Sequence, residues 1–297
     1  MNLPQNPIFI VGYPRSGTTL LQRLLAAQPG LYTFPETHYF NVIEKTIRWE
    51  KEDRESIPRS SLATVFENIE KKMDFRFSDL EIKTLHRQAE KKQLSSKTLF
   101  EYIVTRHLLN LYPEITDMAS FRWMEKTPNH AHFLERILEM YPRAQVLHIL
   151  RHPVPAIYSR KLKFPFNRET PVTELARRWN RMLLDVERFQ QRHPAQIFTL
   201  RYEDLVQDLE KQLQSVADFL NVRFDFETLI PFKQKQEQNA GLLILPSETW
   251  KMEDLRLEIA DTNDKYHGLI PAADAAAIED MTMENMNRYG YEPFGRK

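Results

Sequence analysis

The chain has 297 residues, of which 42% are hydrophobic and 28% are charged, a composition typical of a globular protein and not of a disordered one. Its 41 basic and 41 acidic side chains balance, so bulk charge gives no argument for binding nucleic acid or an anionic membrane. Cysteine is absent, which excludes disulfides, thiolate catalysis and cysteine-based metal sites. We expect one domain over residues 1–297, because no Gly/Ser-rich or Pro-rich stretch divides the chain.

The N-terminal residues bear on the compartment. Residues 1–7 carry no basic segment followed by an apolar stretch, and the chain then runs directly into a strand-like segment, so we expect no signal peptide. No window approaches the roughly 18 consecutive apolar residues that a membrane span requires. We therefore expect a soluble, cytoplasmic protein.

The first predicted unit is a strand, a turn and a helix. Residues 8–11 form a short continuous apolar run, as expected of a strand buried on both faces. A glycine-containing turn covers residues 12–17, and leucines at helical spacing then predict a helix over 18–27, ended by Pro29 and Gly30. This order of elements opens an α/β fold.

The rest of the chain continues the alternation. Residues of about 40 to 115 are charged and helical in pattern, and we expect them to form a helical insertion. Further strands are predicted at 32–34, 121–124, 145–150 and 196–200, and further helices at 129–140, 171–191, 209–220 and 272–287. Alternating strands and helices predict a central parallel sheet with helices on both faces.

The turn after the first strand has the composition of an anion-binding loop. Backbone N–H groups converge in such a loop, and the following helix directs its positive end at the same point. Gly17 allows the backbone to approach an anion closely, and Thr18 and Thr19 add hydroxyl donors. The glycine spacing matches a phosphate-binding P-loop, but Thr18 replaces the P-loop lysine and a cation stands instead at Arg15. We therefore predict a P-loop-type sheet, while the missing lysine disfavours an ATP or GTP hydrolase.

Several segments follow this loop in a recognisable order. Residues 14–20 read Pro-Arg-Ser-Gly-Thr-Thr-Leu, and the later segments are 35–38, 125–128, 147–153 with Ser159, and 201–205. Together they resemble the sulfotransferases that use 3′-phosphoadenosine-5′-phosphosulfate (PAPS), in the form found in tyrosylprotein sulfotransferases and many bacterial members. The resemblance spans roughly residues 8–220, and the ordered set is more specific than the glycine loop alone.

The resemblance implies which residues bind PAPS. Arg151 follows an apolar strand and resembles the arginine that binds the 3′-phosphate, together with Ser159 two helical turns later, which requires a helix to begin soon after Arg151. Lys163 lies one turn beyond Ser159 and can reach the same phosphate. The predicted binding set is Arg15, Ser16, Gly17, Thr18 and Thr19 at the 5′-phosphosulfate, Arg151, Ser159 and Lys163 at the 3′-phosphate, Tyr202 near the adenine, and Lys251 in a late segment that closes over the nucleotide.

The resemblance also assigns catalytic roles. Glu36 matches the catalytic glutamate, which accepts the proton of the acceptor as its oxygen attacks sulfur. An unperturbed glutamate has a pKa of about 4.3 and is a weak base, so burial or other tuning is required. His38 and His130 are alternative bases, because imidazole titrates closer to neutral pH. Lys126, together with Arg15, is expected to neutralise charge that develops during transfer.

These expectations describe in-line sulfuryl transfer from PAPS to a hydroxyl or amine, with release of 3′-phosphoadenosine-5′-phosphate (PAP). We expect no metal, because the nine histidines show no metal-binding spacing. Two alternatives remain: a P-loop small-molecule kinase that uses Mg-ATP, and a nucleotide-binding module without catalysis. The missing P-loop lysine and the lack of a clear metal-binding aspartate disfavour the kinase, and Glu36 with Lys126 disfavours the module. Small-molecule, lipid, carbohydrate and peptide acceptors all remain open, as does the oligomeric state, and the insertion is expected to shape the acceptor pocket.

Overall fold

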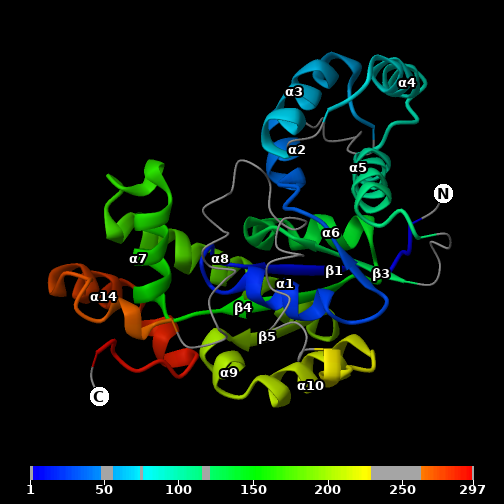
Figure 1. Ribbon diagram of the computed structural model, residues 1–297. Coiled ribbons are helices and arrows are strands. Elements are labelled where there is room, and N and C mark those ends of the chain that lie inside the picture. The colour runs from blue at the N-terminus through cyan, green and yellow to red at the C-terminus, as the bar shows by residue number, and fades with distance from the viewer. Residues whose placement is uncertain (1–2, 48–55, 74–75, 116–120, 229–261, 296–297) are drawn as a thin grey trace.

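The computed structural model describes residues 3–47, 56–73, 76–115, 121–228 and 262–295, and its centre is a five-stranded sheet (Figure 1). The strands are β1 (Ile8–Gly12), β2 (Leu31–Thr33), β3 (Arg122–Lys126), β4 (Gln145–Leu150) and β5 (Ile197–Arg201). They lie in the order β2-β3-β1-β4-β5, and all neighbours are parallel. All five strands therefore end at the same edge of the sheet, where the loops that follow them meet. The predicted α/β class is confirmed.

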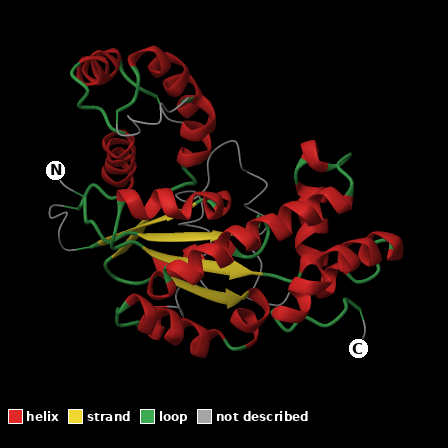
Figure 2. Ribbon diagram, turned by 180° about the vertical axis from the view of Figure 1, so that it is seen from behind, coloured by secondary structure: helices red, strands yellow, loops and turns green. Residues whose placement is uncertain are grey.

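Both faces of the sheet are covered by helices, because β1 sends alternate side chains in opposite directions. Ile8 and Ile10 are fully buried with residues of α1 (Thr18–Ala26), α9 (Tyr202–Gln207) and α10 (Leu209–Leu220). Phe9 and Val11 are buried on the other face, in a larger cluster with α6 (Leu134–Met140), α7 (Pro153–Lys163), α8 (Val172–Arg192) and α14 (Ala272–Arg288). Figure 2 shows α6 and α8 crossing this second face. Each such buried Ile or Phe side chain stabilises the fold by about 1.5–3 kcal/mol.

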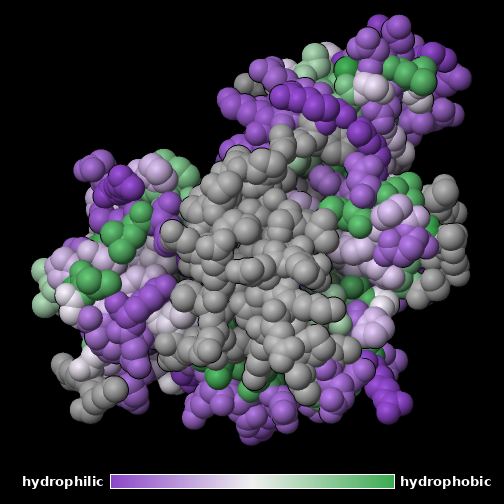
Figure 3. Space-filling model, viewed as in Figure 1, coloured by the Kyte–Doolittle hydropathy of each residue, from purple (hydrophilic) through white to green (hydrophobic). Residues whose placement is uncertain are grey.

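The predicted helical insertion consists, in its described part, of α2 (Tyr39–Thr46), α3 (Leu62–Met73), α4 (Asp79–Glu90) and α5 (Ser96–Leu111). These helices project beyond the sheet (Figure 1), and their outward surface is mainly hydrophilic (Figure 3). Apolar side chains of these helices, such as Ile43, Val65 and Ile69, are buried. Among the described residues, none of the helices is long and apolar enough to cross a lipid bilayer.

Two boundaries near the end of β3 differ from prediction. The strand predicted at 121–124 runs to Lys126, because Glu125 and Lys126 pair in register with Phe9 and Ile10 of β1. The helix predicted at 129–140 begins as a 3₁₀ segment, η2 (Pro128–Phe133), and becomes α-helical only in α6. A hydrogen bond from the His130 N–H to the Thr127 carbonyl at 2.9 Å closes this tighter turn. The strand predicted at 32–34 lies one residue earlier, at 31–33, whereas 145–150 and 209–220 have the predicted bounds.

Candidate functional site

Two close approaches of the backbone shape the loop after β1. A Cβ atom at Gly12 would lie 2.4 Å from the Ile149 carbonyl oxygen in β4, and a Cβ atom at Gly17 would lie 2.7 Å from the Tyr202 ring. Gly17 also has φ 100°, in the region that favours glycine, and it caps the N-terminus of α1. Glycine is therefore required at both positions, since β4 and α9 leave no room for a side chain.

Arg15 and Ser16 place two polar side chains in the loop after β1. Arg15 has φ 80°, a left-handed conformation that costs a non-glycine residue about 1–3 kcal/mol. Its Nε donates to the Ser159 hydroxyl at 3.1 Å, which joins the loop to α7. The Ser16 hydroxyl is fully buried and has no hydrogen-bond partner within the described residues. An unpaired buried hydroxyl costs about 1–3 kcal/mol, so the loop suits an oxyanion at the N-terminus of α1.

Arg151 directly follows β4 and is 5% exposed. Its guanidinium donates to three neutral acceptors, namely Asn263 Oδ1 at 2.8 Å, Thr262 Oγ1 at 3.0 Å and the Arg15 carbonyl oxygen at 3.0 Å. It also lies over the Tyr202 ring, 4.4 Å from the centroid. Within the described part of the chain the guanidinium meets no carboxylate. A buried cation without a counter-ion is unfavourable, so this arrangement favours an anionic ligand.

Glu36 and Lys126 form a buried ion pair between the loop after β2 and the end of β3. Glu36 is 7% exposed and Lys126 is 1% exposed, and the Lys126 ammonium donates to Glu36 Oε1. The other carboxylate oxygen of Glu36 lies 3.4 Å from His38 Nε2. His38 caps α2 with φ 50°, again a left-handed conformation. The carboxylate is thus held between an ammonium and an imidazole, as suits a group that exchanges a proton.

Glu125 is a candidate that the sequence did not reveal. It is fully buried, and its carboxylate accepts hydrogen bonds from Thr37 Oγ1 at 2.8 Å and Thr127 Oγ1 at 2.6 Å, and contacts His130 Nδ1 at 2.9 Å. Burial by itself would raise the pKa of Glu125, but the electrostatic interaction with His130 and these hydrogen bonds outweigh burial and lower it. The carboxylate therefore stays ionised in the core.

The position of Glu125 connects the two elements that carry the ion pair. Thr37 immediately follows Glu36, and Thr127 immediately follows Lys126. The Glu125 carboxylate accepts hydrogen bonds from both threonines and so links the Glu36 loop to the residue after Lys126. The signal in the sequence was two adjacent charged residues at the end of a buried strand, where charged side chains are rarely found unpaired.

The predicted residues fall into two groups at one edge of the sheet. Arg15, Ser159, Arg151 and Tyr202 are joined by direct contacts after β1, β4 and β5. Thr18 is buried in the first turn of α1, and Thr19 beside it is partly buried. Their roles in binding remain predictions.

Other predicted residues lie at the margin of these groups. Lys163 is the last residue of α7, one turn after Ser159, and is partly buried. His130 is fully buried between Glu125 and the Phe40 ring, whose centroid lies 4.9 Å away, which disfavours it as a base. Lys251 lies outside the described residues. No group of three or more Asp, Glu or His in the described ranges is arranged to hold a metal ion.

The model of the Sulfotransferase family matches residues 7–226. The chain is 25% identical over 276 residues to omega-hydroxy-beta-dihydromenaquinone-9 sulfotransferase Stf3 of Mycobacterium tuberculosis, covering 76% of this chain and 65% of that protein. It is 24% identical over 293 residues to protein-tyrosine sulfotransferase A of Caenorhabditis elegans, covering 96% of this chain and 67% of that protein.

The chain spans only part of its relatives. It is 23% identical over 242 residues to an uncharacterized protein of Aquifex aeolicus. The matched region covers 78% of this chain but only 28% of that protein. By contrast, it covers almost the whole of one solved structure, the sulfotransferase domain from the curacin biosynthetic pathway.

Solved structures share the fold. That curacin domain has a TM-score of 0.57 at 22% identity, covering 98% of this chain and 99% of that chain. Mouse sulfotransferase SULT7A1, solved as a complex with PAP, has a TM-score of 0.54 at 12% identity, covering 96% of this chain and 85% of that chain. Because the family model matches well over half of the residues, the protein belongs to the sulfotransferase family.

Proposed function

We propose that the protein transfers a sulfuryl group from PAPS to a hydroxyl or amine and releases PAP. Membership of the sulfotransferase family supports sulfuryl transfer, and a solved relative in fold was crystallised with PAP. The observation that carries the proposal is Arg151, a buried cation with only neutral acceptors among the described residues, beside a loop whose Ser16 hydroxyl has no partner there. Both features favour a ligand with more than one anionic group.

The residues at the strand ends fit the parts of PAPS. Ser16, Gly17 and Thr18, at the N-terminus of α1, would hold the 5′-phosphosulfate, with Arg15 beside it. Arg151 and Ser159 would hold the 3′-phosphate, and Lys163 and Tyr202 complete the nucleotide site. When bound, PAPS supplies an activated sulfuryl group. The task of the chain is then mainly positioning and charge stabilisation.

Glu36 is the proposed base. Its carboxylate would take the proton of the acceptor while the acceptor oxygen or nitrogen forms its bond to sulfur. The Lys126 ammonium stabilises the carboxylate form of Glu36 and would also stabilise negative charge on the sulfuryl oxygens. His38, at 3.4 Å from the second oxygen of Glu36, is placed to pass that proton onward.

The acceptor side is assigned to the insertion. We propose that the whole chain forms one catalytic domain and that α2 to α5 shape the acceptor pocket, because α2 begins directly after the Glu36 loop. The names of the two sulfotransferase relatives specify a hydroxylated menaquinone derivative and protein tyrosine, so we expect a hydroxyl acceptor first.

Thermal unfolding with and without ligands tests the donor. A ligand at 100 times its Kd stabilises a protein by about 2.7 kcal/mol, which is readily measured. We expect PAP to raise Tm without a metal, ADP to raise it far less, and Arg151→Ala to abolish the PAP response. Arg192→Gln, an exposed change on α8, is the matched control and keeps the response. A shift with Mg-ATP and none with PAP would overturn the proposal in favour of a kinase. If PAP binds but the protein does not convert PAPS to PAP with any acceptor, the result would favour a nucleotide-binding module without catalysis.

A further inference from the structure

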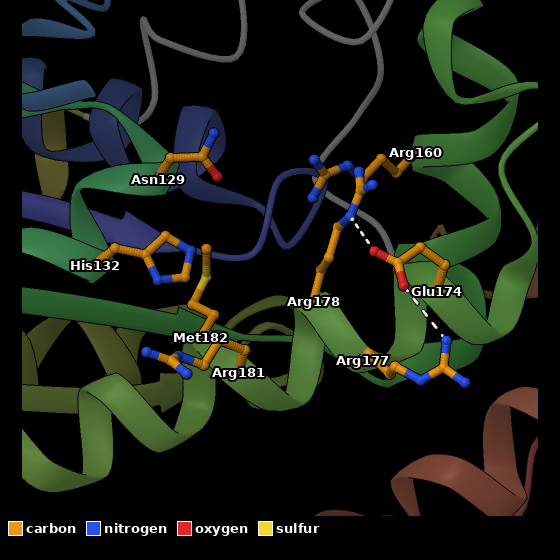
Figure 4. A pocket seen from close by; sticks show the side chains of 8 residues that line it. All are labelled: Asn129, His132, Arg160, Glu174, Arg177, Arg178, Arg181 and Met182. Carbon is orange, nitrogen blue, oxygen red and sulfur yellow. Dashed lines mark hydrogen bonds and ion pairs between the residues drawn. The ribbon is translucent and has the colours of Figure 1, made fainter. Parts of the chain in front are cut away.

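A pocket of about 360 Å³ lies between η2, α7 and α8 (Figure 4). Its lining residues are Asn129, His132, Arg160, Glu174, Arg177, Arg178, Arg181 and Met182. We call it the arginine cleft, because four of these side chains are arginines and only one is a carboxylate. Its volume is that of a small-molecule site.

The charges of the arginine cleft are only partly matched. Glu174 accepts from Arg178 Nε at 3.1 Å and from Arg177 at 3.4 Å, so one carboxylate serves two arginines. Asp185 likewise serves Arg181, at 3.3 Å, and His132, at 2.7 Å. The cleft therefore keeps an excess of positive charge.

Arg160 is the arginine of the cleft that pairs with no carboxylate among the described residues, and its side chain interacts instead with Tyr13. Its Nε is buried and has no hydrogen-bond partner among the described residues, while its guanidinium lies over the Tyr13 ring, 4.8 Å from the centroid. Figure 4 shows Arg160 reaching from α7 toward Arg178 on α8. Two guanidinium groups that converge from different helices repel each other unless an anion lies between them.

Three arginines lie close together on one face of α8. Arg177 and Arg181 are spaced i,i+4, and Arg178 and Arg181 are spaced i,i+3, so these like charges repel one another, and the i,i+3 and i,i+4 ion pairs with Glu174 and Asp185 offset only part of that repulsion. All three side chains are more than 40% exposed, at 64%, 46% and 66%, so their charges are available to a ligand.

The arginine cleft lies beside the loop after β1 and beside the segment that follows Lys126, and both of these carry residues of the proposed active site. Tyr13, beneath Arg160, belongs to the loop after β1, and Arg160 follows Ser159, to which Arg15 donates. Asn129 belongs to η2, which begins two residues after Lys126. Tyr202, by contrast, packs on the opposite face of the sheet with α1 and α9. The cleft is thus on the side away from the proposed adenine position.

We propose that the arginine cleft binds a carboxylate, sulfate or phosphate group of a small acceptor and so selects anionic acceptors. This inference rests on the proposed sulfotransferase function. Guanidinium groups bind such oxyanions through paired N–H donors, and Arg160 and Arg178 are placed to do so from two helices. Met182, buried at the base of the cleft, provides an apolar surface for the carbon part of the acceptor.

The test uses a matched pair of probes and a reporter in the cleft. The chain has 10 methionines, and Met182 can be assigned by its loss in Met182→Leu after ¹³C-methyl labelling. The probes are 4-hydroxybenzenesulfonate and its neutral counterpart, 4-hydroxybenzenesulfonamide. We expect the sulfonate to shift the Met182 resonance saturably and to bind at least about tenfold more tightly than the sulfonamide. Equal binding of the two probes, or no shift with the sulfonate, overturns the proposal.

Variants locate the effect. Arg178→Gln and Arg160→Gln should each weaken sulfonate binding by about tenfold, whereas Arg192→Gln, further along α8, should not. Arg178 is exposed, so its variant remains informative even if Arg160→Gln fails to fold. Unchanged binding in Arg178→Gln overturns the proposal.

A titration repeated with saturating PAP separates this inference from the proposed function. Loss of the sulfonate shift with PAP would place the probe in the nucleotide site and overturn the cleft. If PAP does not bind but the sulfonate still shifts the Met182 resonance, PAPS is not the donor, whereas the anion site in the cleft is supported.

Discussion

The site at the carboxyl ends of the strands has two halves, which differ in whether basic side chains contact acidic ones. We call them the paired half, built by β2 and β3, and the cationic half, built by β1 and β4. In the half built by β2 and β3, Glu36 pairs with Lys126 and Glu125 pairs with His130. In the half built by β1 and β4, Arg151 is held by neutral acceptors, and Arg15 donates to the Ser159 hydroxyl. The first half has both signs of charge in contact, whereas the described contacts of Arg151 include no acid.

This difference separates two tasks. A buried ion pair is satisfied without a ligand, so it can hold a base in place before any substrate arrives. Arg151 contacts only neutral acceptors among the described residues, so an anionic ligand would supply the opposite charge and would bind more tightly for that reason. We therefore expect changes in the paired half to affect turnover, and changes in the cationic half to affect PAP binding.

Glu36→Gln is expected to have the largest effect. The amide keeps the shape of the side chain but cannot accept the proton, so PAP formation from PAPS and an acceptor should fall about 100- to 10,000-fold. PAP affinity, measured by thermal shift, should stay within a factor of about two, because it depends on the other half. Glu67→Gln on the exposed face of α3 is the control. A loss of PAP affinity as large as the loss of turnover would break the comparison.

Gly17→Ala tests the cationic half. Its positive φ and the 2.7 Å approach to Tyr202 predict a loss of about 2 kcal/mol in the free energy of unfolding, together with loss of PAP binding. Gly30→Ala is a matched control, since Gly30 has φ 78° but no atom within 4 Å of its added Cβ. Denaturant titration and thermal shift with PAP measure both effects. Equal losses in the two variants would show that crowding by α9 does not shape the loop.

A pH dependence of stability tests β4 within the cationic half. Burial lowers the pKa of His148 to about 4, from about 6.5 when unfolded, so between these values the unfolded chain binds more protons. Stability is therefore expected to fall as pH is lowered, by about 2 kcal/mol from pH 7.5 to 5 for this residue. His107, with its pKa also lowered to about 4 by burial, acts in the same direction.

His148→Gln separates the two contributions. Its hydrogen bond to Thr199 on β5 is available to the amide, so the fold is expected to persist. Denaturant unfolding at both pH values should show a smaller loss in this variant than in the wild type. An unchanged pH dependence would mean that protonation of His148 does not oppose folding.

Glu125→Gln is expected to have the smallest effect, on turnover. The amide keeps one acceptor for Thr37 or Thr127 but loses the charge beside His130, so kcat should fall by about tenfold while PAP affinity is unchanged. The readout that separates positioning from stability is kcat measured well below the Tm of the variant. A change in KM for the acceptor with kcat intact would assign Glu125 to the acceptor pocket.

Local patterns predicted much of the fold. Apolar runs identified β1 and β4, because strands buried on both faces need such runs. The glycine spacing identified the turn between β1 and α1, and the ordered motifs led to Glu36, Lys126, Arg151 and Ser159, which the structure places at one edge of the sheet.

The sequence by itself determined the class of fold, the glycine loop and the types of side chain that meet at the strand ends, because these depend on periodicity and short-range geometry. Only the tertiary structure decided which charges are paired. The register of β3 against β1 buries Glu125 between Thr37 and His130. The packing of α7 against α8 places Arg160 and Arg178 in the lining of one pocket. Such contacts depend on how separate elements pack, and no local pattern records them.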